Sequence, residues 1–133
     1  EDVVQQGRPT RTVYTLTDLG REELIEWSRQ PSTPDSIKDD FLVRLYGLEY
    51  VDVAALREDL QQRMEGHRDR LSRFSAMAEQ MNPTTVMEFG RLRGLEIGLR
   101  YEREWANWCE ETLAALDGDT LESLSSTPLA LVK

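Results

Sequence analysis

The longest uninterrupted hydrophobic pattern in the chain predicts an amphipathic helix from Asp52, which can cap its N-terminus, to about Gln80. Apolar side chains recur there in alternating steps of four and three residues, which is the spacing of the a/d seam of a coiled coil. The seam could contact a partner or be covered entirely by the rest of the chain. Because one other helix cannot cover both sides of so long a helix, we favour a partner, namely a second copy of the chain. The residues of this predicted dimerisation seam are Leu60, Met64, His67, Leu71 and Phe74.

A second long helix is predicted to follow the first and to pair with it. Pro83 ends the first helix, and Thr85 with Glu88 three residues later has the spacing of a capping box, which marks a helix start. The apolar pattern then continues to about Leu116. Because only a short break separates the two helices, they are expected to fold back on each other as an antiparallel hairpin.

Three glycines, Gly90, Gly94 and Gly98, recur at every fourth position of that second predicted helix. A glycine inside a helix costs about 1 kcal/mol relative to alanine, so a repeated glycine needs a reason. The stripe can permit close approach of another helix, or it can leave room for a small molecule beside the helix. We favour close packing and assign Gly94 and Gly98 to the predicted dimer interface.

The first 30 residues are predicted to form a β-hairpin and a helix. Residues 3–6 and 12–16 favour strands, and the Gly-Arg-Pro-Thr sequence of residues 7–10 favours a turn between them. Thr17 or Asp18 can cap the following helix, which supplies an apolar side for the strands to pack against.

A Pro/Ser-rich segment, residues 31–35, separates this N-terminal part from the rest and is the clearest domain boundary in the sequence. Beyond it, residues 37–46 carry apolar positions at helical spacing and are predicted to form a short amphipathic helix. Gly47 is expected to end that helix in a left-handed conformation.

The charge of the chain limits its possible contacts. Its 16 Lys and Arg against 25 Asp and Glu give a net charge of -9, so any contact with nucleic acid must be confined to a small part of the surface. The sequence has no run of about 18 apolar residues and no signal-peptide pattern, so we expect a cytoplasmic protein that does not enter a membrane. Because the chain begins without Met and within a hairpin unit, we also expect further residues upstream of Glu1.

The residue types present disfavour an enzyme. The single histidine cannot form a multi-histidine zinc site, and the chain has no Glu-x-x-His pair, phosphate-binding glycine loop or recognisable Ser/His/Asp signature. We therefore expect no catalytic residue, metal or cofactor. His67 is expected to be a packing residue with satisfied polar atoms rather than a pH switch or metal ligand, and Cys109 a packed thiol. Several glutamates are expected to be solvated partners of Arg100 and Arg103, namely Glu96, Glu102, Glu104, Glu110 and Glu111.

The N-terminal part carries the most specific motifs. The Gly-Arg-Pro turn at residues 7–9 is followed by Arg11, by Thr-Val-Tyr-Thr-Leu-Thr at residues 12–17 and by the pair Gly20 and Arg21. This arrangement resembles the wing hairpin and the following helix of the winged helix-turn-helix domain in the PadR family of transcriptional regulators.

Two further segments are similar to the same family. Residues 95–108 carry a glycine, an aromatic-glutamate pair and a tryptophan at similar intervals to the last helix of the family. Residues 41–45 also match, so that the resemblance covers nearly the whole chain up to Leu116. It implies a repressor that pairs through its C-terminal helices, so that two winged domains meet two half-sites of an operator. The recognition helix of the family would lie upstream of Glu1.

The resemblance also implies which residues would contact ligands. On the wing, Arg8 and Arg11, with Thr10 between them, would contact phosphates or a narrow minor groove of double-stranded operator DNA; the alternative is a solvated basic loop. In some PadR relatives, aromatic residues at the dimer interface hold flat apolar effectors, whereas ordinary core packing is the alternative. The aromatic residues concerned are Tyr101, Trp105 and Trp108.

Together these features predict a mainly α fold, in which a partial winged helix, made of a β-hairpin plus a helix, precedes an antiparallel helical dimerisation hairpin. The predicted domains are an incomplete winged helix-turn-helix domain at residues 1–30, a helical dimerisation and effector domain at 37–117 and a flexible tail at 118–133. The predicted function is a DNA-binding transcriptional repressor relieved by a small aromatic effector. The alternatives are a helical protein-protein adaptor that does not bind DNA and a small enzyme with a carboxylate-lined pocket.

Overall fold

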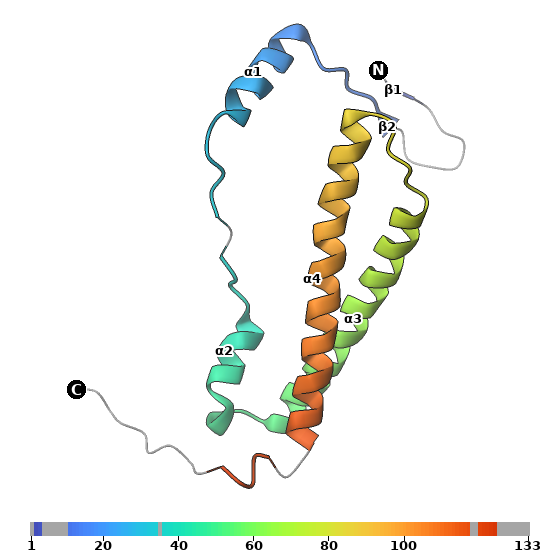
Figure 1. Cartoon of the computed structure of the whole chain (residues 1–133). Coiled ribbons are helices and arrows are strands. Elements are labelled where there is room, and N and C mark those ends of the chain that lie inside the picture. The colour runs from blue at the N-terminus through green and yellow to red at the C-terminus, as the bar shows by residue number, and fades with distance from the viewer. Residues whose placement is uncertain (1, 4–10, 35, 118–119, 125–133) are drawn as a thin grey trace, which may run out of the picture. The chain divides into compact units, whose positions relative to one another are not determined.

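The computed structural model of the chain describes residues 2–3, 11–34, 36–117 and 120–124, and it is mainly helical, as predicted (Figure 1). The chain divides into two compact units, Glu1–Lys38 and Asp39–Lys133. None of the helices in the described part is long and apolar enough to cross a membrane. The elements are β1 (Asp2–Val3), β2 (Arg11–Thr12), α1 (Asp18–Ser28), α2 (Asp40–Tyr46), the short 3-10 helix η1 (Leu48–Tyr50), α3 (Val53–Glu79) and α4 (Val86–Asp117).

The first unit contains a short pair of strands. β1 and β2 pair antiparallel, with Asp2 opposite Thr12. The second strand is shorter than predicted, since residues 13–16 are not in a strand. The predicted turn at residues 7–10 lies outside the described residues, so the wing hairpin stays a prediction.

Helix α1 begins where the sequence predicts. The side chain of Thr17 accepts a hydrogen bond from the backbone N–H of Gly20 at 3.1 Å, so Thr17 is the cap and Asp18 lies in the first turn, where negative charge is favourable. No side chain of α1 is buried. The apolar side of α1 is therefore not covered by the residues that the structure describes; it is made of Leu19, Leu24, Ile25 and Trp27.

The second unit begins with α2, whose ends differ from the prediction. Asp39 caps the helix, because its Oδ1 accepts a hydrogen bond from the backbone N–H of Phe41 at 2.9 Å. Ile37, predicted to be helical, lies before this cap and is exposed. Gly47 ends the helix, but its φ of -96° is not the predicted left-handed conformation. The chain continues directly into η1 after Gly47, so no left-handed reversal is required.

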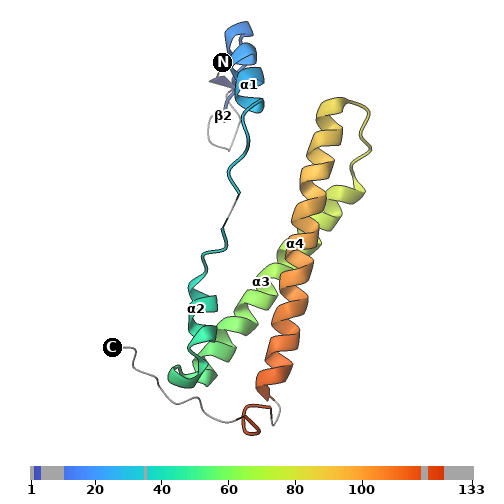
Figure 2. The same cartoon turned by 60° about the vertical axis from the view of Figure 1, so that its left-hand side comes forward.

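Helices α3 and α4 form the predicted antiparallel hairpin (Figures 1 and 2). The side chain of Asp52 caps α3 by accepting a hydrogen bond from the N–H of Ala55 at 3.1 Å. The predicted capping box starts α4, since Thr85 Oγ1 accepts from Glu88 N at 3.2 Å and Glu88 Oε2 accepts from Thr85 N at 3.0 Å. The backbone N–H and hydroxyl of Thr84 also donate to this carboxylate, and these hydrogen bonds hold the pKa of Glu88 below its usual value.

The hydrophobic core lies where α2 packs against the hairpin. Its buried apolar residues are Phe41, Leu56, Leu60, Met64, Ala106 and Cys109. Cys109 is a packed free thiol, as predicted, and burial raises its pKa. No side chain of residues 68–101 is buried, so within the described chain the core occupies only the end of the hairpin that α2 covers.

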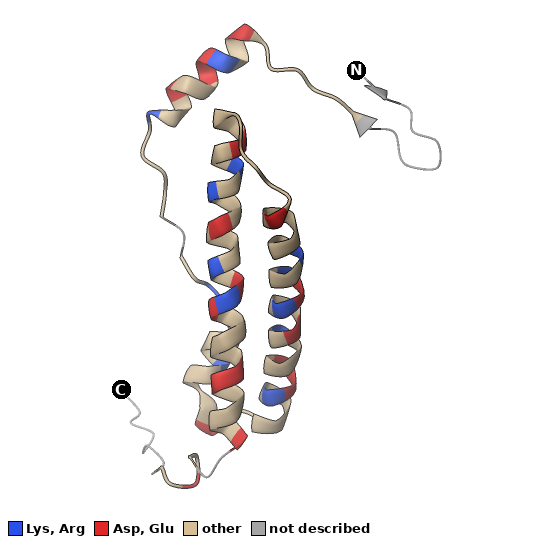
Figure 3. Ribbon diagram, turned by 45° about the vertical axis from the view of Figure 1, so that its right-hand side comes forward, with Lys and Arg blue, Asp and Glu red and all other residues tan. Residues whose placement is uncertain are grey.

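Acidic and basic residues alternate along both long helices (Figure 3). Glu96 pairs with Arg93 on the same helix, and Glu110 pairs across the hairpin with Arg68. Arg100 and Arg103 were the predicted partners. Arg93 is instead the partner of Glu96 because it lies three residues before it on the same helix. Arg68 is the partner of Glu110 because it lies on the facing side of α3. Since acidic positions interrupt the basic ones along both described helices, we expect no broad basic surface there for a phosphate backbone.

Candidate functional site

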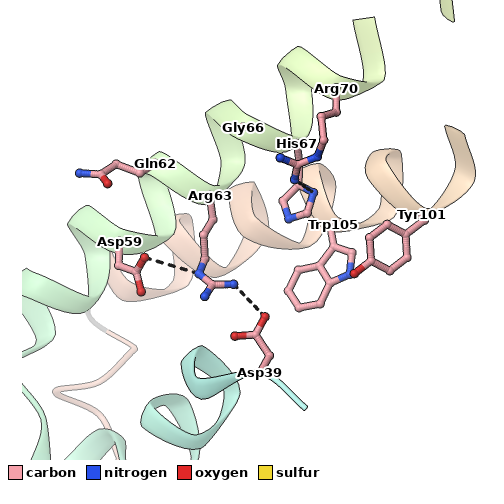
Figure 4. Close-up of a pocket in the computed structure, with 9 residues that line it drawn as sticks. All are labelled: Asp39, Asp59, Gln62, Arg63, Gly66, His67, Arg70, Tyr101 and Trp105. Atoms are coloured by element: carbon pink, nitrogen blue, oxygen red, sulfur yellow. Dashed lines mark hydrogen bonds and ion pairs between the residues drawn. The ribbon is translucent and has the colours of Figure 1, made fainter. Parts of the chain in front are cut away.

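A pocket of about 390 Å³ opens beside the start of α2, along α3 and α4 (Figure 4). This volume is within the range of pockets that hold small ligands. One end of the pocket is polar and the other is aromatic. No group of three or more potential metal ligands lies together in the described residues. The lining residues are Asp39, Asp59, Gln62, Arg63, Gly66, His67, Arg70, Tyr101 and Trp105.

The polar end is organised around one guanidinium group, that of Arg63. Its Nη1 donates to Oδ2 of Asp39 at 2.8 Å, and its Nε lies 3.5 Å from Oδ1 of Asp59. The same group lies over the ring of Phe41, with Cζ 4.9 Å from the ring centroid. The hydrogen bond from Arg63 holds the pKa of Asp39 below its usual value. The polar end is therefore a network of paired charges.

The aromatic end is formed by His67 of α3 and aromatic residues of α4. The His67 ring stacks on Trp105, with centroids 5.5 Å apart and an interplanar angle of 10°, and Tyr101 lies edge-on to it at 6.3 Å. Oε2 of Glu102 lies 2.6 Å from Nδ1 of His67 and accepts from Nε of Arg70 at 3.0 Å. His67 is thus buried and hydrogen-bonded, as predicted, and the carboxylate fixes the orientation of its ring.

Glu102 does not line the pocket but contacts two residues that do, His67 and Arg70, and its burial was not predicted from the sequence. It was expected to be solvated, but only 6% of its surface is exposed, because it lies between α3 and α4 and is bonded there. The sequence does contain a signal for this burial, since Glu102 belongs to a seam of α4 that steps by four and three residues. That seam is made of Leu95, Leu99, Glu102, Ala106 and Cys109. A carboxylate on this seam, in a hairpin whose facing helix holds the only histidine, predicts a buried pair.

Two of the three predicted effector residues line the pocket. Tyr101 and Trp105 do, whereas Trp108 lies outside it. Trp108 packs edge-on against the core residue Phe41, with ring centroids 6.1 Å apart, and edge-on against Trp105 at 5.3 Å. Trp108 therefore supports the pocket wall from behind, as an ordinary core aromatic.

The predicted dimerisation seam of α3 is covered by its own chain over its first half. Leu60 is fully buried, and Met64 and His67 are nearly so. Two elements make this possible, because α4 covers one side of α3 and Phe41 of α2 packs on the same core. Over these positions the structure matches the alternative, in which the seam is packed within the chain.

The glycine stripe of α4 divides into two parts. A β-carbon on Gly98 would lie 3.5 Å from the ring of Phe74, so the missing side chain makes room for α3 of the same chain. Phe74 and its seam neighbour Leu71 are half-buried by this packing. Gly90 and Gly94 have nothing within 4 Å of their β-carbon positions. Another helix could therefore approach α4 closely at these two glycines, but no described residue of this chain does so.

An exposed apolar face accompanies those two glycines. We name it the α4 apolar face, and its residues are Val86, Gly90, Gly94, Ile97 and Tyr101, which follow one another in steps of four, four, three and four. Val86 is 91% exposed, Ile97 66% and Tyr101 54%. A continuous apolar strip with two glycines allows another helix to approach closely. Tyr101 belongs both to this face and to the rim of the pocket.

The predicted DNA-contacting residues are not placed by the structure. Arg8 and Thr10 lie outside the described residues. The backbone of Arg11 lies in β2, opposite Val3, and its side chain is outside what is described. Their contact with an operator stays a prediction.

Comparisons with known proteins agree on one class of protein. The family model described as Virulence activator alpha C-term matches residues 37–117. "Probable transcriptional regulator Rv1176c" of Mycobacterium tuberculosis is 31% identical over 131 residues, covering 86% of this chain and 68% of the relative. "Negative transcriptional regulator PadR" of Bacillus subtilis is 27% identical over 124 residues, covering 87% of this chain and 68% of the relative. The chain thus spans about two thirds of the length of these relatives.

A solved structure has the same fold. The crystal structure of Bacillus subtilis PadR in complex with operator DNA matches with a TM-score of 0.66 at 24% identity, over 88% of this chain and 68% of that chain. At this identity the likeness establishes the fold.

Proposed function

The chain belongs to the PadR family of transcriptional regulators, and from this membership we propose that it acts in the dimer of an operator-binding repressor that releases DNA when a flat aromatic effector enters the pocket. The observation that carries the effector part is the flat wall made by the stacked rings of His67 and Trp105. Repression is supported by the Bacillus subtilis relative, which is named a negative transcriptional regulator. DNA binding is supported by the likeness in fold to a protein crystallised with operator DNA.

Contact with DNA is proposed to be local and to include Arg8, Thr10 and Arg11. The chain has a net charge of -9, and its hairpin carries interleaved charges, so a small basic turn is the part suited to reach phosphates or a minor groove. A recognition helix belonging to the same winged domain would supply the base contacts.

Replacing Arg8 and Arg11 together by alanine in the full-length regulator is expected to weaken operator affinity roughly tenfold or more. If each arginine neutralises one phosphate, the slope of log affinity against log salt concentration should fall in magnitude by about 2 for each copy, and therefore by about 4 for the proposed dimer. Fluorescence anisotropy titrations at several salt concentrations measure both quantities. Replacing Arg73 and Arg91, which are exposed on the hairpin, changes the net charge equally and serves as the control. Unchanged affinity and slope in the wing variant would remove both arginines from the contact.

A second copy of the chain is proposed to cover the α4 apolar face. Gly90 and Gly94 lack any neighbour at their β-carbon positions, which suits close approach of a helix. The side chains of this face, Val86, Ile97 and Tyr101, are exposed, and burying them against a second copy would stabilise the dimer by removing apolar surface from water. A symmetric dimer formed in this way would present two winged domains to the two half-sites of an operator.

The effector is proposed to lie flat against His67 and Trp105, with Tyr101 at its edge. A flat aromatic molecule can extend the existing stack, and the polar end of the pocket offers paired charges that fix its orientation. Because Tyr101 also belongs to the α4 apolar face, a bound effector can favour one arrangement of the two copies over another. Release of the operator would then follow from different effector affinities for the two arrangements.

Replacing Trp105 by leucine is expected to weaken effector binding about tenfold or more, because the flat surface of the stack is lost. The experiment first selects, from a panel of flat aromatic compounds, those that release operator DNA from the full-length regulator. Their affinity is then measured by calorimetry on both proteins. Trp108→Phe is the control, since Trp108 does not line the pocket and phenylalanine keeps an aromatic ring packed behind Trp105, so this variant should keep the response. Equal loss in both variants, or in neither, would place the effector elsewhere.

A further inference from the structure

The start of the second unit depends on one carboxylate with two roles. Asp39 is the first residue of that unit and the N-cap of α2. Its Oδ1 accepts from the backbone N–H of Phe41 at 2.9 Å, while its Oδ2 accepts from Arg63 at 2.8 Å. The residues before Asp39 lead to the first unit, so the carboxylate fixes the point where the chain enters the helical unit.

Arg63 joins this point to the pocket. In Figure 4 its guanidinium lies between Asp59 and Asp39 at the polar end, as part of the pocket wall. Nε of Arg63 is buried and makes no hydrogen bond, although Asp59 lies within ion-pair distance. Because Nε is buried, a ligand oxygen at this end can bond this unsatisfied donor only if the guanidinium turns, and that turn moves the group that holds Asp39.

We propose that Arg63 couples the pocket to the start of α2, so that a ligand oxygen bound by its guanidinium weakens the hold on Asp39 and loosens the entry into the helical unit. As a means of regulation, this coupling rests on the effector site proposed above. The hydrogen bond between Arg63 and Asp39 is present without any ligand. The ligand would compete with Asp39 for Arg63, because a guanidinium that turns toward a ligand oxygen loses the geometry that binds Asp39.

The test removes each partner separately in the full-length regulator. Arg63→Gln takes away the guanidinium, whereas Asp39→Asn removes the charge of the pair but keeps an oxygen that can cap α2, since asparagine caps as well as aspartate. Arg63→Gln is expected to accelerate hydrogen exchange at the first amides of α2, those of Phe41 to Val43, about three- to tenfold, which is the range for a weakened cap. Operator affinity should fall about threefold or more in both variants, because each variant loosens the start of α2 as the proposed ligand would. The double variant should show no larger change than the larger single one, because both act on one link.

Two controls separate this coupling from a general loss of structure. The first control is Arg44→Gln. Arg44 is the other arginine near Asp59, but it lies on α2 and does not line the pocket. Its replacement should leave both the hydrogen exchange of α2 and the operator affinity unchanged. Arg63→Lys keeps a positive charge near Asp39 and should recover part of the lost protection. Unchanged exchange at the start of α2 in Arg63→Gln would overturn the proposal, and so would additive effects in the double variant. If the wild-type regulator binds no operator, the proposed function fails, while the exchange measurement still decides the coupling.

Discussion

Replacing Glu102 by alanine is expected to lower the free energy of unfolding by roughly 2–3 kcal/mol. The carboxylate is almost completely buried and lies 2.6 Å from Nδ1 of His67 and 3.0 Å from Nε of Arg70, so its removal leaves the Arg70 Nε donor without its acceptor and takes from His67 its closest polar partner. The Arg70 side chain is 39% exposed and can turn toward water, which keeps the loss below that of a fully buried unpaired charge. Urea denaturation followed by circular dichroism measures the change.

Glu104→Ala is the matched control for this prediction. Glu104 lies two residues further along the same helix but is exposed, so its replacement should change the free energy of unfolding by no more than about 0.5 kcal/mol. Equal stabilities of the two alanine variants would show that the buried bonds of Glu102 contribute nothing net. Such a result would also remove the basis for a fixed His67 ring in the pocket.

Helix starts were predictable from the sequence where the capping contact is local. Asp52 caps α3 through the N–H three residues ahead, and Thr85 and Glu88 bond each other across the same short distance. The start of α2 was predicted too early, at Ile37, although its cap is also local, since Asp39 accepts from the N–H of Phe41 two residues ahead. What no local pattern shows is the contact of Asp39 with Arg63, 24 residues further along the chain.

The periodic pattern of α3 identified buried residues without identifying what covers them. Leu60 and Met64 repeat at coiled-coil spacing whether the facing helix belongs to the same chain or to another. In the structure α4 and α2 supply the cover for Leu60 and Met64, and the exposed apolar face proposed to meet a partner lies on α4. A repeat of apolar residues therefore predicts that a face is buried, and tertiary packing decides by which partner.

The candidate site was predictable only in its aromatic part. Tyr101 and Trp105 lie four residues apart on one side of α4, so the sequence alone could group them. At the polar end, Asp39 at the start of α2 lies next to Arg63 and Asp59 of α3. The sequence does not predict this contact, because it depends on how α2 packs against α3. Residue type also misled the prediction for Glu102, because its two bonded partners offset the cost of burying a carboxylate.

Replacing Ile97 by aspartate is expected to convert the regulator from a dimer to a monomer at micromolar concentration. A charge at the centre of the α4 apolar face would be buried without a partner in the proposed interface, which corresponds to a dissociation constant raised roughly 100-fold or more. The fold of each copy should survive, because Ile97 is 66% exposed in the single chain. Sedimentation velocity measures the oligomeric state, and thermal denaturation verifies the fold.

Two further variants decide whether the α4 apolar face is the interface. Asn107→Asp introduces the same charge at an exposed position of α4 outside this face and should leave the dimer intact. Gly94→Val keeps the face apolar but fills the open space at its β-carbon, so it should weaken the dimer only if a second helix approaches closely there.

The monomeric Ile97→Asp variant should also bind the operator far more weakly, because the two half-sites of the operator would no longer be bound by one particle. A dimer that tolerates aspartate at position 97 would have to form through another surface, and Tyr101 would then link the pocket to no interface.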